Sequence, residues 1–399
     1  MDCTEVFEST HVHDRMPKAM LKRFYVADNV DYVPMYSWKA DGFYATLKRR
    51  VQEHLLATAQ AEGHSKADAR LGHHGTGVFI WRMYAIMAVW LALGVGAIGG
   101  GLWWCALPWG FFAFALGGYG HEAMHAGVYK SAWANRLLAL VTLDLQGLSS
   151  FVFTAIHVPL HHVHCNVKDL DPDIEVHFPL VRERPEQRLY WFHRLQPIYA
   201  WILYFITLPV LWFNDIVTVT FGIWFGPYGR IRKPYLNEAL LFAGFKVLSF
   251  SIFYALVFVL HPWPQALLIF VLMLGGGGFA VQATFALSHQ NELAMNLAAR
   301  KCPQAGDWGA LQVQTTVDFQ HGHWLPTTFL GGLGYQLEHH LFPTVSYSRL
   351  GEIAPIVKAT CEEFGLPYFY YPTAAHALLA HARFLVRMSR PEPVAVSVA

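Results

Sequence analysis

Residues 77–98 read GVFIWRMYAIMAVWLALGVGAI, and residues 102–125 read LWWCALPWGFFAFALGGYGHEAMH. Each stretch is apolar over about 20 residues, which is the length that an α-helix needs to cross the hydrocarbon core of a bilayer. The first is predicted to span a membrane, with Arg82 near enough to its start to reach water. The second runs from about Leu102 to Gly120 and ends directly at His121. Because only the glycine linker 99–101 separates them, we expect a hairpin with a short far-side turn.

Two more apolar stretches, at about residues 239–260 and 265–287, repeat this pattern farther along the chain. The uncharged turn His261-Pro262-Trp263-Pro264 joins them, so we expect a second hairpin. Between the hairpins, residues 197–224 are also apolar but are interrupted by Pro209 and by Asn214 with Asp215. We therefore predict an interfacial or re-entrant helix there, since a full span would place the later histidines on the opposite side of the membrane.

The positions of lysine and arginine give the hairpins a direction. Nearly all of these residues fall in the N-terminal segment, the central region 155–238 and the C-terminal third, and the two far-side turns have none. By the positive-inside rule, these three regions are predicted to be cytoplasmic. The predicted fold is an all-α integral membrane protein, with four transmembrane helices in two hairpins and a cytosolic helical cap.

The domain division follows from this layout. We predict a cytosolic N-terminal segment at residues 1–76, a membrane domain at 77–390 and a C-terminal tail at 391–399. Within the first segment, an apolar stripe beside basic residues favours a helix over residues 45–61. No early apolar run of the signal-peptide kind is visible, so membrane insertion is expected to rely on the internal spans.

The composition supports a membrane protein and excludes some functions. Hydrophobic residues make up 54% of the chain and charged residues only 14%, which suits a bilayer better than water. The formal net charge of +1 argues against a nucleic-acid partner, which would require a surplus of basic side chains. The five cysteines form no CxxC pair and no disulfide-like framework, so zinc ribbons are not expected and a reducing compartment fits best.

Histidine is abundant, at 22 residues, and three histidine clusters lie just beyond predicted membrane ends or in the predicted cytosolic loops. The first cluster, HEAMH, places His121 and His125 four residues apart, so both imidazoles share one face of a helix and can reach one site. The second, HVPLHH, contains His157, His161 and His162. The last two are neighbours and point about 100° apart on a helix, which suits two adjacent metals better than one.

The third cluster is QLEHH, with Gln336, His339 and His340, and His289 follows the last predicted span. All these residues are predicted on the cytoplasmic side, so we expect them to form a shared metal site. Imidazoles bind iron, copper and zinc alike, so ligand type alone does not name the metal. Eight histidines are too many for one tetrahedral zinc, but enough for two metals with open positions.

Two other functions are compatible with parts of this pattern. HEAMH matches the HExxH sequence of zinc proteases, in which Glu122 would be the general base, but this leaves HVPLHH and QLEHH unexplained. A histidine-rich metal transporter should carry ionisable residues within its spans. Almost none occur there beyond Arg82 and Lys246.

Together, HEAMH, HVPLHH and QLEHH resemble the three histidine boxes of the membrane fatty-acid desaturase superfamily. DWGALQVQTTVDF at 307–319, followed by GGLGYQLEHHLFP at 331–343, resembles the front-end desaturases, in which glutamine replaces the first histidine of the third box. The stretch from HHVHCN to DPD, with Asn166, Asp171 and Asp173, is also similar to that group. The resemblance covers roughly residues 75–390.

This resemblance implies a di-iron site, with Gln336 as a weak ligand or a residue that holds a water. The implied iron ligands are His121, His125, His157, His161, His162, His339 and His340, with His289 as an eighth. The chain departs from many relatives in having Phe151 and Phe153, where they have a tryptophan shortly before the second box. The HPGG heme motif of a fused cytochrome b5 domain is missing, so electrons are expected from a separate ferredoxin or cytochrome b5.

The implied reaction is oxygen-dependent desaturation of a fatty acyl chain. No side chain is basic enough to deprotonate an unactivated methylene, so two iron ions and the co-substrate O2 must supply the oxidant. A front-end enzyme inserts its double bond between an existing one and the carboxyl end of the chain. A sphingolipid desaturase or a fatty acyl hydroxylase would use nearly the same ligands, so both stay open.

The sequence also leaves several partners open. The acyl chain could be attached to a lipid, to CoA or to a carrier protein, and the membrane could be a bacterial inner membrane or the endoplasmic reticulum.

Five acidic residues near the histidines could orient ligand N–H groups, or could equally be solvated loop charges. These residues are Glu122, Asp169, Asp171, Asp173 and Glu338.

Overall fold

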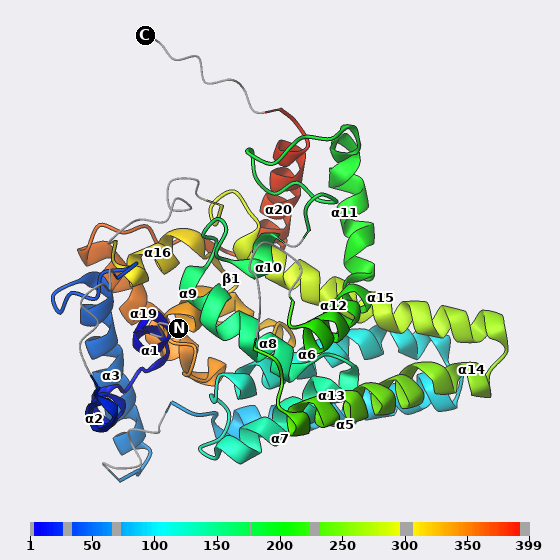
Figure 1. The fold of residues 1–399 in the computed structure, drawn as a ribbon, viewed down its shortest axis with the longest axis horizontal. Coiled ribbons are helices and arrows are strands. Elements are labelled where there is room, and N and C mark those ends of the chain that lie inside the picture. The colour runs from blue at the N-terminus through cyan, green and yellow to red at the C-terminus, as the bar shows by residue number, and fades with distance from the viewer. Residues whose placement is uncertain are drawn as a thin grey trace.

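The protein is mainly helical, with long helices on one side and a cap of shorter helices on the other (Figure 1). A computed structural model describes residues 4–26, 34–65, 73–175, 177–223, 232–295 and 306–391. Within them, two short strands, β1 (Asp318–Phe319) and β2 (Tyr370–Tyr371), pair in parallel. The prediction of a helical protein with long apolar helices is confirmed.

Two long helices occupy the residues predicted to form the first hairpin. Helix α5 (Gly77–Gly94) continues as the π-helix η2 (Val95–Gly99), and Thr76 caps its start by accepting a hydrogen bond from the backbone N–H of Phe79. After a short turn, η3 (Trp103–Cys105) leads into α6 (Ala106–Met124). Helix α6 continues beyond the predicted end of the span, so the first histidine cluster extends from the hairpin on a rigid helix.

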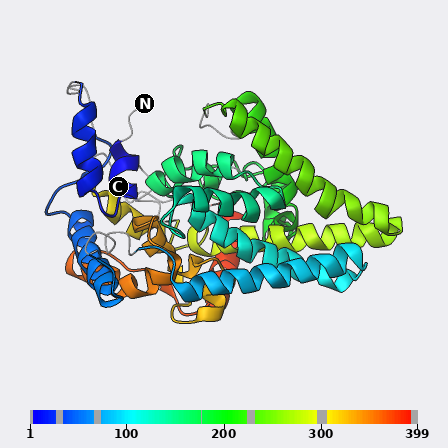
Figure 2. The ribbon, with the colours of Figure 1, turned by 90° about the horizontal axis from the view of Figure 1, so that it is seen from below.

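The residues predicted to form the second hairpin are also helical, and the turn between these helices touches the turn after η2. It comprises α13 (Leu236–Ser249), the π-helix η7 (Phe250–Ala255), α14 (Leu256–Leu260) and α15 (Trp263–His289). Nε2 of His261 lies 2.6 Å from the carbonyl oxygen of Ile98, and the Gln265 amide donates to the carbonyl of Gly101 at 2.8 Å. The two hairpins therefore point the same way, although α13 and α5 diverge toward their other ends (Figure 2).

Glycines bring α6 and α15 into backbone contact. A Cβ atom added at Gly110 would lie 2.5 Å from the carbonyl oxygen of Met273, and one added at Gly276 would lie 2.5 Å from that of Leu107. Such small residues permit close helix crossings within a membrane. Because His121 lies near the end of α6 and His289 ends α15, this crossing helps to bring the two histidines together.

Within the described residues, three continuous helices are long and apolar enough to cross a membrane, namely Gly77–Gly99, Leu236–Leu260 and Trp263–His289. Helix α6 is not among these three. Two bent helix pairs could each be a broken span or a re-entrant loop. One pair, Trp191–Phe205 with Thr207–Phe221, bends by 66° at the segment predicted to be interfacial or re-entrant.

The other bent pair was not expected from the sequence. It comprises Ala132–Gln146 and Ser150–His164, which meet at 109°. Its elements are α7 (Ala132–Thr142), η4 (Asp144–Gln146), α8 (Ser150–Ile156), η5 (His157–His161) and α9 (His162–His164). The elements of the first pair are η6 (Trp191–Leu195), α11 (Gln196–Phe205) and α12 (Thr207–Phe221). The second histidine cluster therefore ends a bent helical segment rather than lying in a loop.

The cap packs the N-terminal segment against the C-terminal part of the chain. Helix α3 (Phe43–Ala61) contains the predicted helix 45–61, and it buries Leu47, Val51 and Leu55 beside α19 (Tyr347–Glu363). The remaining elements are α1 (Thr4–Thr10), α2 (Arg15–Leu21), η1 (Lys22–Phe24), α10 (Pro172–Glu175), α16 (Trp308–Thr315), α17 (Trp324–Phe329), η8 (Leu333–Tyr335), α18 (Gln336–Leu341) and α20 (Ala374–Met388).

Candidate metal centre

The structure brings all eight predicted histidines together from four separate segments. HEAMH ends α6, HVPLHH covers η5 and the start of α9, QLEHH lies in α18, and the eighth histidine ends α15. Their ring nitrogens form two groups, each of which could hold a metal ion. The five-histidine group is His121, His125, His157, His162 and His339, and the three-histidine group is His161, His289 and His340, with Cys165.

In the five-histidine group, the ligand atoms all lie within 4.8 Å of one another. Nε2 of His157 is 2.9 Å from Nε2 of His121 and 3.0 Å from Nε2 of His162. Nε2 of His125 and of His339 are buried, and neither has a hydrogen-bond partner in the described structure. Buried polar atoms are normally satisfied, so this convergence of imidazole nitrogens fits a bound cation.

The three-histidine group also contains buried ring nitrogens that lack hydrogen-bond partners. Nε2 of His161 and of His340 are buried without a hydrogen-bond partner among the described residues. The side-chain nitrogen of Gln336 lies 2.9 Å from Nε2 of His289, while the amide oxygen of Gln336 has no such partner. The predicted glutamine therefore lies at the second group, with an oxygen free to bind a metal or a water.

Cys165 was not predicted at the site, because the cysteine pattern indicated no metal binding. Its Sγ lies 3.5 Å from Nδ1 of His289 and is fully buried. The only signal in the sequence is that Cys165 follows directly after HHVH, at the end of the second histidine cluster.

The π-helix η5 determines toward which of the two groups each histidine of HVPLHH points. Pro159, within η5, has no amide hydrogen to donate to a carbonyl one turn earlier, and the helix widens at this point. His157 and His162, five residues apart, consequently meet on one face. The neighbours His161 and His162 face different groups, which is the arrangement that two adjacent metals require.

Three acceptors hold the histidine rings from behind. Asp173 Oδ2 lies 3.0 Å from Nδ1 of His157, and both oxygens of Asp171 lie 3.0 Å from Nδ1 of His161. Nδ1 of His340 lies 3.1 Å from Oε1 of Gln312. Such acceptors place the proton on Nδ1, which leaves Nε2 free as the ligand atom.

The other acidic residues considered in the sequence do not contact these rings. Glu122 accepts a hydrogen bond from the backbone N–H of Tyr347 at 2.7 Å, and Asp169 is exposed. Glu338 belongs to α18, and the Tyr368 hydroxyl contacts both Glu338, at 3.0 Å, and Asp318, at 2.8 Å. These contacts anchor the segment that carries the third histidine cluster.

The protonation state suits metal binding. Burial lowers the pKa of His339 well below its usual value, and nearby imidazoles lower it further. Burial and neighbouring imidazoles also hold the pKa of His340 well below its usual value. Both rings are therefore neutral near pH 7, which is the form that ligates a metal.

The sequence and the geometry together agree with a known family. The family described as fatty acid desaturase matches residues 109–372, about two thirds of the chain. The chain belongs to the fatty acid desaturase family. The desaturase is thus an oxidoreductase, and neither the metal-transporter nor the zinc-protease alternative is needed to explain its histidines.

Three relatives show how far the similarity extends. The desaturase is 31% identical over 366 residues to the sn-1 linoleoyl-lipid 6-desaturase of Arthrospira platensis, covering 90% of this chain and 96% of that protein. It is 29% identical to an acyl-lipid (8-3)-desaturase of Physcomitrium patens, covering 95% and 76%. It is 30% identical to the Delta(5) fatty acid desaturase A of Dictyostelium discoideum, covering 97% and 83%. These relatives confirm the expected front-end type.

Proposed function

We propose that this desaturase inserts a double bond between an existing one and the carboxyl end of a lipid-linked acyl chain. It would use O2 as co-substrate and electrons from a separate ferredoxin or cytochrome b5. The observation that carries this proposal is the pair of adjacent histidine groups, with Gln336 beside His289 of the three-histidine group. The lipid-linked substrate is supported by relatives whose names specify acyl-lipid substrates.

Each histidine group would hold one iron ion. The five-histidine group would bind the first, and His161, His289 and His340 with Gln336 would bind the second. The two irons would supply the oxidant from dioxygen that hydrogen removal from a methylene requires. The protein's own contribution is to fix the rings through Asp171, Asp173 and Gln312, and to keep the buried site dry.

The hairpins support a four-span topology with a cytosolic active site. Their tips are hydrogen-bonded to each other, and the histidine groups lie where α6 and α15 end, away from the tips. With the positive-inside rule, we place the histidines on the cytoplasmic face of a bacterial inner membrane or of the endoplasmic reticulum.

The same layout suggests the roles of the domains. The N-terminal segment 1–76 would be part of the cytosolic cap, because α3 packs against α19. Residues 77–390 would form the desaturase domain. Most of the tail predicted at 391–399 lies outside the described residues.

The test is to express the protein in a host supplied with defined polyunsaturated fatty acids and to analyse its lipids by gas chromatography with mass spectrometry. We expect a new double bond on the carboxyl side of an existing one. Oxidised products without added unsaturation would contradict the proposal and favour a hydroxylase. A new double bond in the long-chain base, with none in the fatty acids, would favour a sphingolipid desaturase.

Two histidine variants link the activity to the metal centre. His161→Ala and His339→Ala each remove a ligand of a different group and should abolish turnover without impairing membrane insertion. His376→Ala, which changes an exposed histidine of α20, should remain active and serves as the control. Full activity of either ligand variant would remove that residue from the proposed set.

A further inference from the structure

A pocket of about 260 Å³ lies between α5, α6, α17 and α19, away from the histidine groups. Tyr119 of α6 lines it, together with Arg82, Tyr347 and Trp324. Tyr119 precedes His121 by two residues, so the two side chains point about 200° apart around the helix axis. The pocket therefore lies on the far side of α6 from the metal centre.

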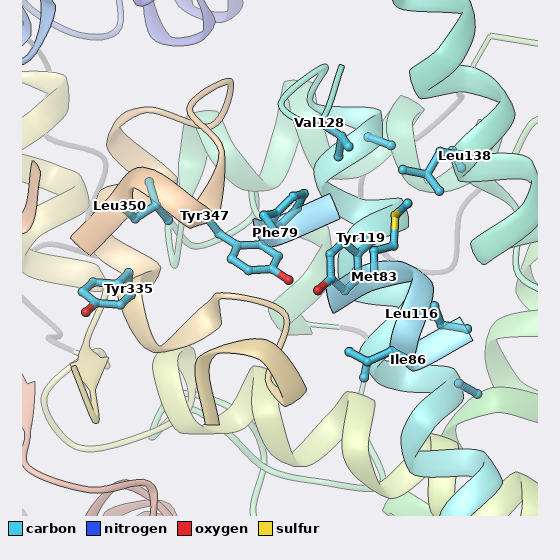
Figure 3. Close-up of a cluster of buried hydrophobic side chains, with 14 of the residues drawn as sticks. Phe79, Met83, Ile86, Leu116, Tyr119, Val128, Leu138, Tyr335, Tyr347 and Leu350 are labelled. Carbon is cyan, nitrogen blue, oxygen red and sulfur yellow. The ribbon is translucent and has the colours of Figure 1, made fainter. Parts of the chain in front are cut away.

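Two buried hydroxyl groups in this pocket have no partner apart from each other. The side chains of Tyr119 and Tyr347 point toward each other (Figure 3), and their hydroxyls are close enough to interact. Neither hydroxyl has a further hydrogen-bond partner in the described structure. Tyr119 is 0% exposed and Tyr347 only 7%. Because two hydroxyls that face each other leave at least one proton without an acceptor, a ligand with acceptor atoms would stabilise the pair.

Arg82 gives the pocket a positive charge. Its guanidinium lies 5.0 Å from the centre of the Trp324 ring, and no carboxylate of the described residues pairs with it. The charge is close enough to act on both tyrosine hydroxyls. The carboxyl group of Glu122 also lies near these hydroxyls, but it is held by the backbone N–H of Tyr347. One cation and two tyrosine hydroxyls form a set suited to an anion with several oxygen atoms.

The surroundings of the pocket indicate the level of the membrane boundary. Trp81, Tyr84 and Trp324 are all exposed around it, and such aromatic residues favour the interface between lipid and water. Arg82 lies about 8 Å along α5 from its first residue, Gly77. The anion that membranes present at this depth is the phosphate of a lipid headgroup. Since the pocket is smaller than most that enclose whole ligands, the acyl chains would lie outside it.

We propose that this pocket binds the phosphate of a glycerophospholipid, paired with Arg82 and hydrogen-bonded by Tyr119 and Tyr347. The bound lipid would contact segments that carry the metal centre. Tyr347 donates its backbone N–H to Glu122 within HEAMH, and Tyr335, which also lines the pocket, directly precedes Gln336. The phosphate belongs either to a resident lipid or to the substrate itself, and only the second case rests on the proposed function.

The binding test compares Arg82→Gln with a matched control, Arg188→Gln. Arg188 also lies over an aromatic ring, 5.1 Å from the centre of Tyr190, but does not line the pocket. The full-length proteins, purified in detergent and delipidated, are titrated with dioleoylphosphatidylglycerol and, separately, with phosphate-free monogalactosyldiacylglycerol, and binding is followed by native mass spectrometry. The wild type should prefer the phospholipid, and Arg82→Gln should bind it about tenfold more weakly or worse. Arg188→Gln should match the wild type.

Equal phospholipid binding by Arg82→Gln and the wild type would overturn the proposal, and so would equal affinity of the wild type for the two lipids. The double variant Tyr119→Phe with Tyr347→Phe preserves the aromatic rings and removes only the hydroxyls. It should weaken phospholipid binding several-fold with unchanged metal content, which separates a lost ligand contact from a misfolded protein. Unchanged binding by this double variant would exclude the two hydroxyls and contradict the site as described.

A kinetic arm identifies the source of the phosphate. If KM of Arg82→Gln rises only for acyl chains carried on phospholipids, the pocket holds the substrate headgroup. If binding is lost while KM stays the same for every carrier, the pocket holds a resident lipid. An active enzyme that binds no phospholipid at the pocket would overturn this inference alone. A protein that binds phospholipid there but forms no double bond would contradict the proposed function alone.

Discussion

Both carboxylate oxygens of Asp171 lie 3.0 Å from Nδ1 of His161, and neither side chain is exposed to solvent. The same carboxylate accepts hydrogen bonds from the backbone N–H groups of Asn166, at 2.7 Å, and Asp173, at 3.0 Å. Asp171 thus joins the loop after the second histidine cluster to the ring of a proposed iron ligand. A negative acceptor at Nδ1 also strengthens Nε2 as a ligand.

Replacing Asp171 by asparagine should lower iron affinity by about 10- to 100-fold, because the ring of His161 loses its charged acceptor. Chelator competition followed by metal analysis would measure the change. Asp169→Asn is the matched control, since Asp169 is exposed and has a positive φ of 62° that asparagine tolerates. Equal iron affinity in Asp171→Asn and the wild type would show that the contact between Asp171 and His161 does not contribute to iron binding.

Replacing Gln336 by leucine should weaken the second iron site without abolishing it. Leucine preserves most of the volume but removes the amide that lies 2.9 Å from His289. The loss of one hydrogen-bonding partner costs about 1 kcal/mol, so we expect a several-fold lower iron affinity, and a much larger loss in His289→Ala. Iron titrations followed by Mössbauer spectroscopy would resolve the two sites. A spectrum identical to that of the wild type would exclude Gln336 from the centre.

The metal-free protein should become less stable as the pH falls below about 6.5, the ordinary histidine pKa. Since burial lowers the pKa of His339 and His340 in the folded state, the unfolded chain binds protons that the folded chain excludes. Each ring should contribute a loss of up to about 1.4 kcal/mol per pH unit. Midpoints of thermal unfolding in detergent, measured between pH 7.5 and 5.5, would show this loss of stability. His340→Gln should flatten the dependence, whereas the exposed-site variant His376→Gln should not.

An ion pair between two apolar helices should matter for folding. Lys246 of α13 lies 2.9 Å from the Asp215 carboxylate of α12, and both side chains are buried. Lys246→Met would leave the carboxylate unpaired, which should destabilise the protein by about 3–5 kcal/mol. Adding Asp215→Leu removes that carboxylate and should recover much of the loss. Unfolding midpoints of the two single variants and the double variant form the measurement, and purely additive effects would show that the pair is not coupled.

Local patterns were enough to predict most of the helices. The apolar run 77–98 became a continuous helix over Gly77–Gly99, and the stripe at 45–61 became Phe43–Ala61. Such length and periodicity are properties of adjacent residues, so a single sequence reveals them. The histidine spacing within each cluster is equally local, which explains why the sequence alone could name the seven clustered histidines that the structure brings together, whereas His289 was named from its place after the last predicted span.

Tertiary contacts decided what was missed. The bend between Ala132–Gln146 and Ser150–His164 is not apparent in the sequence, where the segment contains polar residues that other helices bury. Cys165 meets His289 across 124 positions of the chain, and Gln312 meets His340 across 28. No spacing rule connects residues so far apart. The pocket at Arg82 was missed for the same reason, because its walls come from elements that are far apart in the sequence.

The widened helical turn at His157–His161 has a consequence for the length of this segment. Ordinary α-helical winding of the same five residues would turn His162 by about 140° from the face of His157. His162 would then point away from the five-histidine group, although every histidine was still present. A segment one residue shorter would need no widened turn, because four α-helical steps return to nearly the same face. The number of residues between His157 and His162 and the winding of the helix must therefore match, and comparisons that align only the histidines would overlook it.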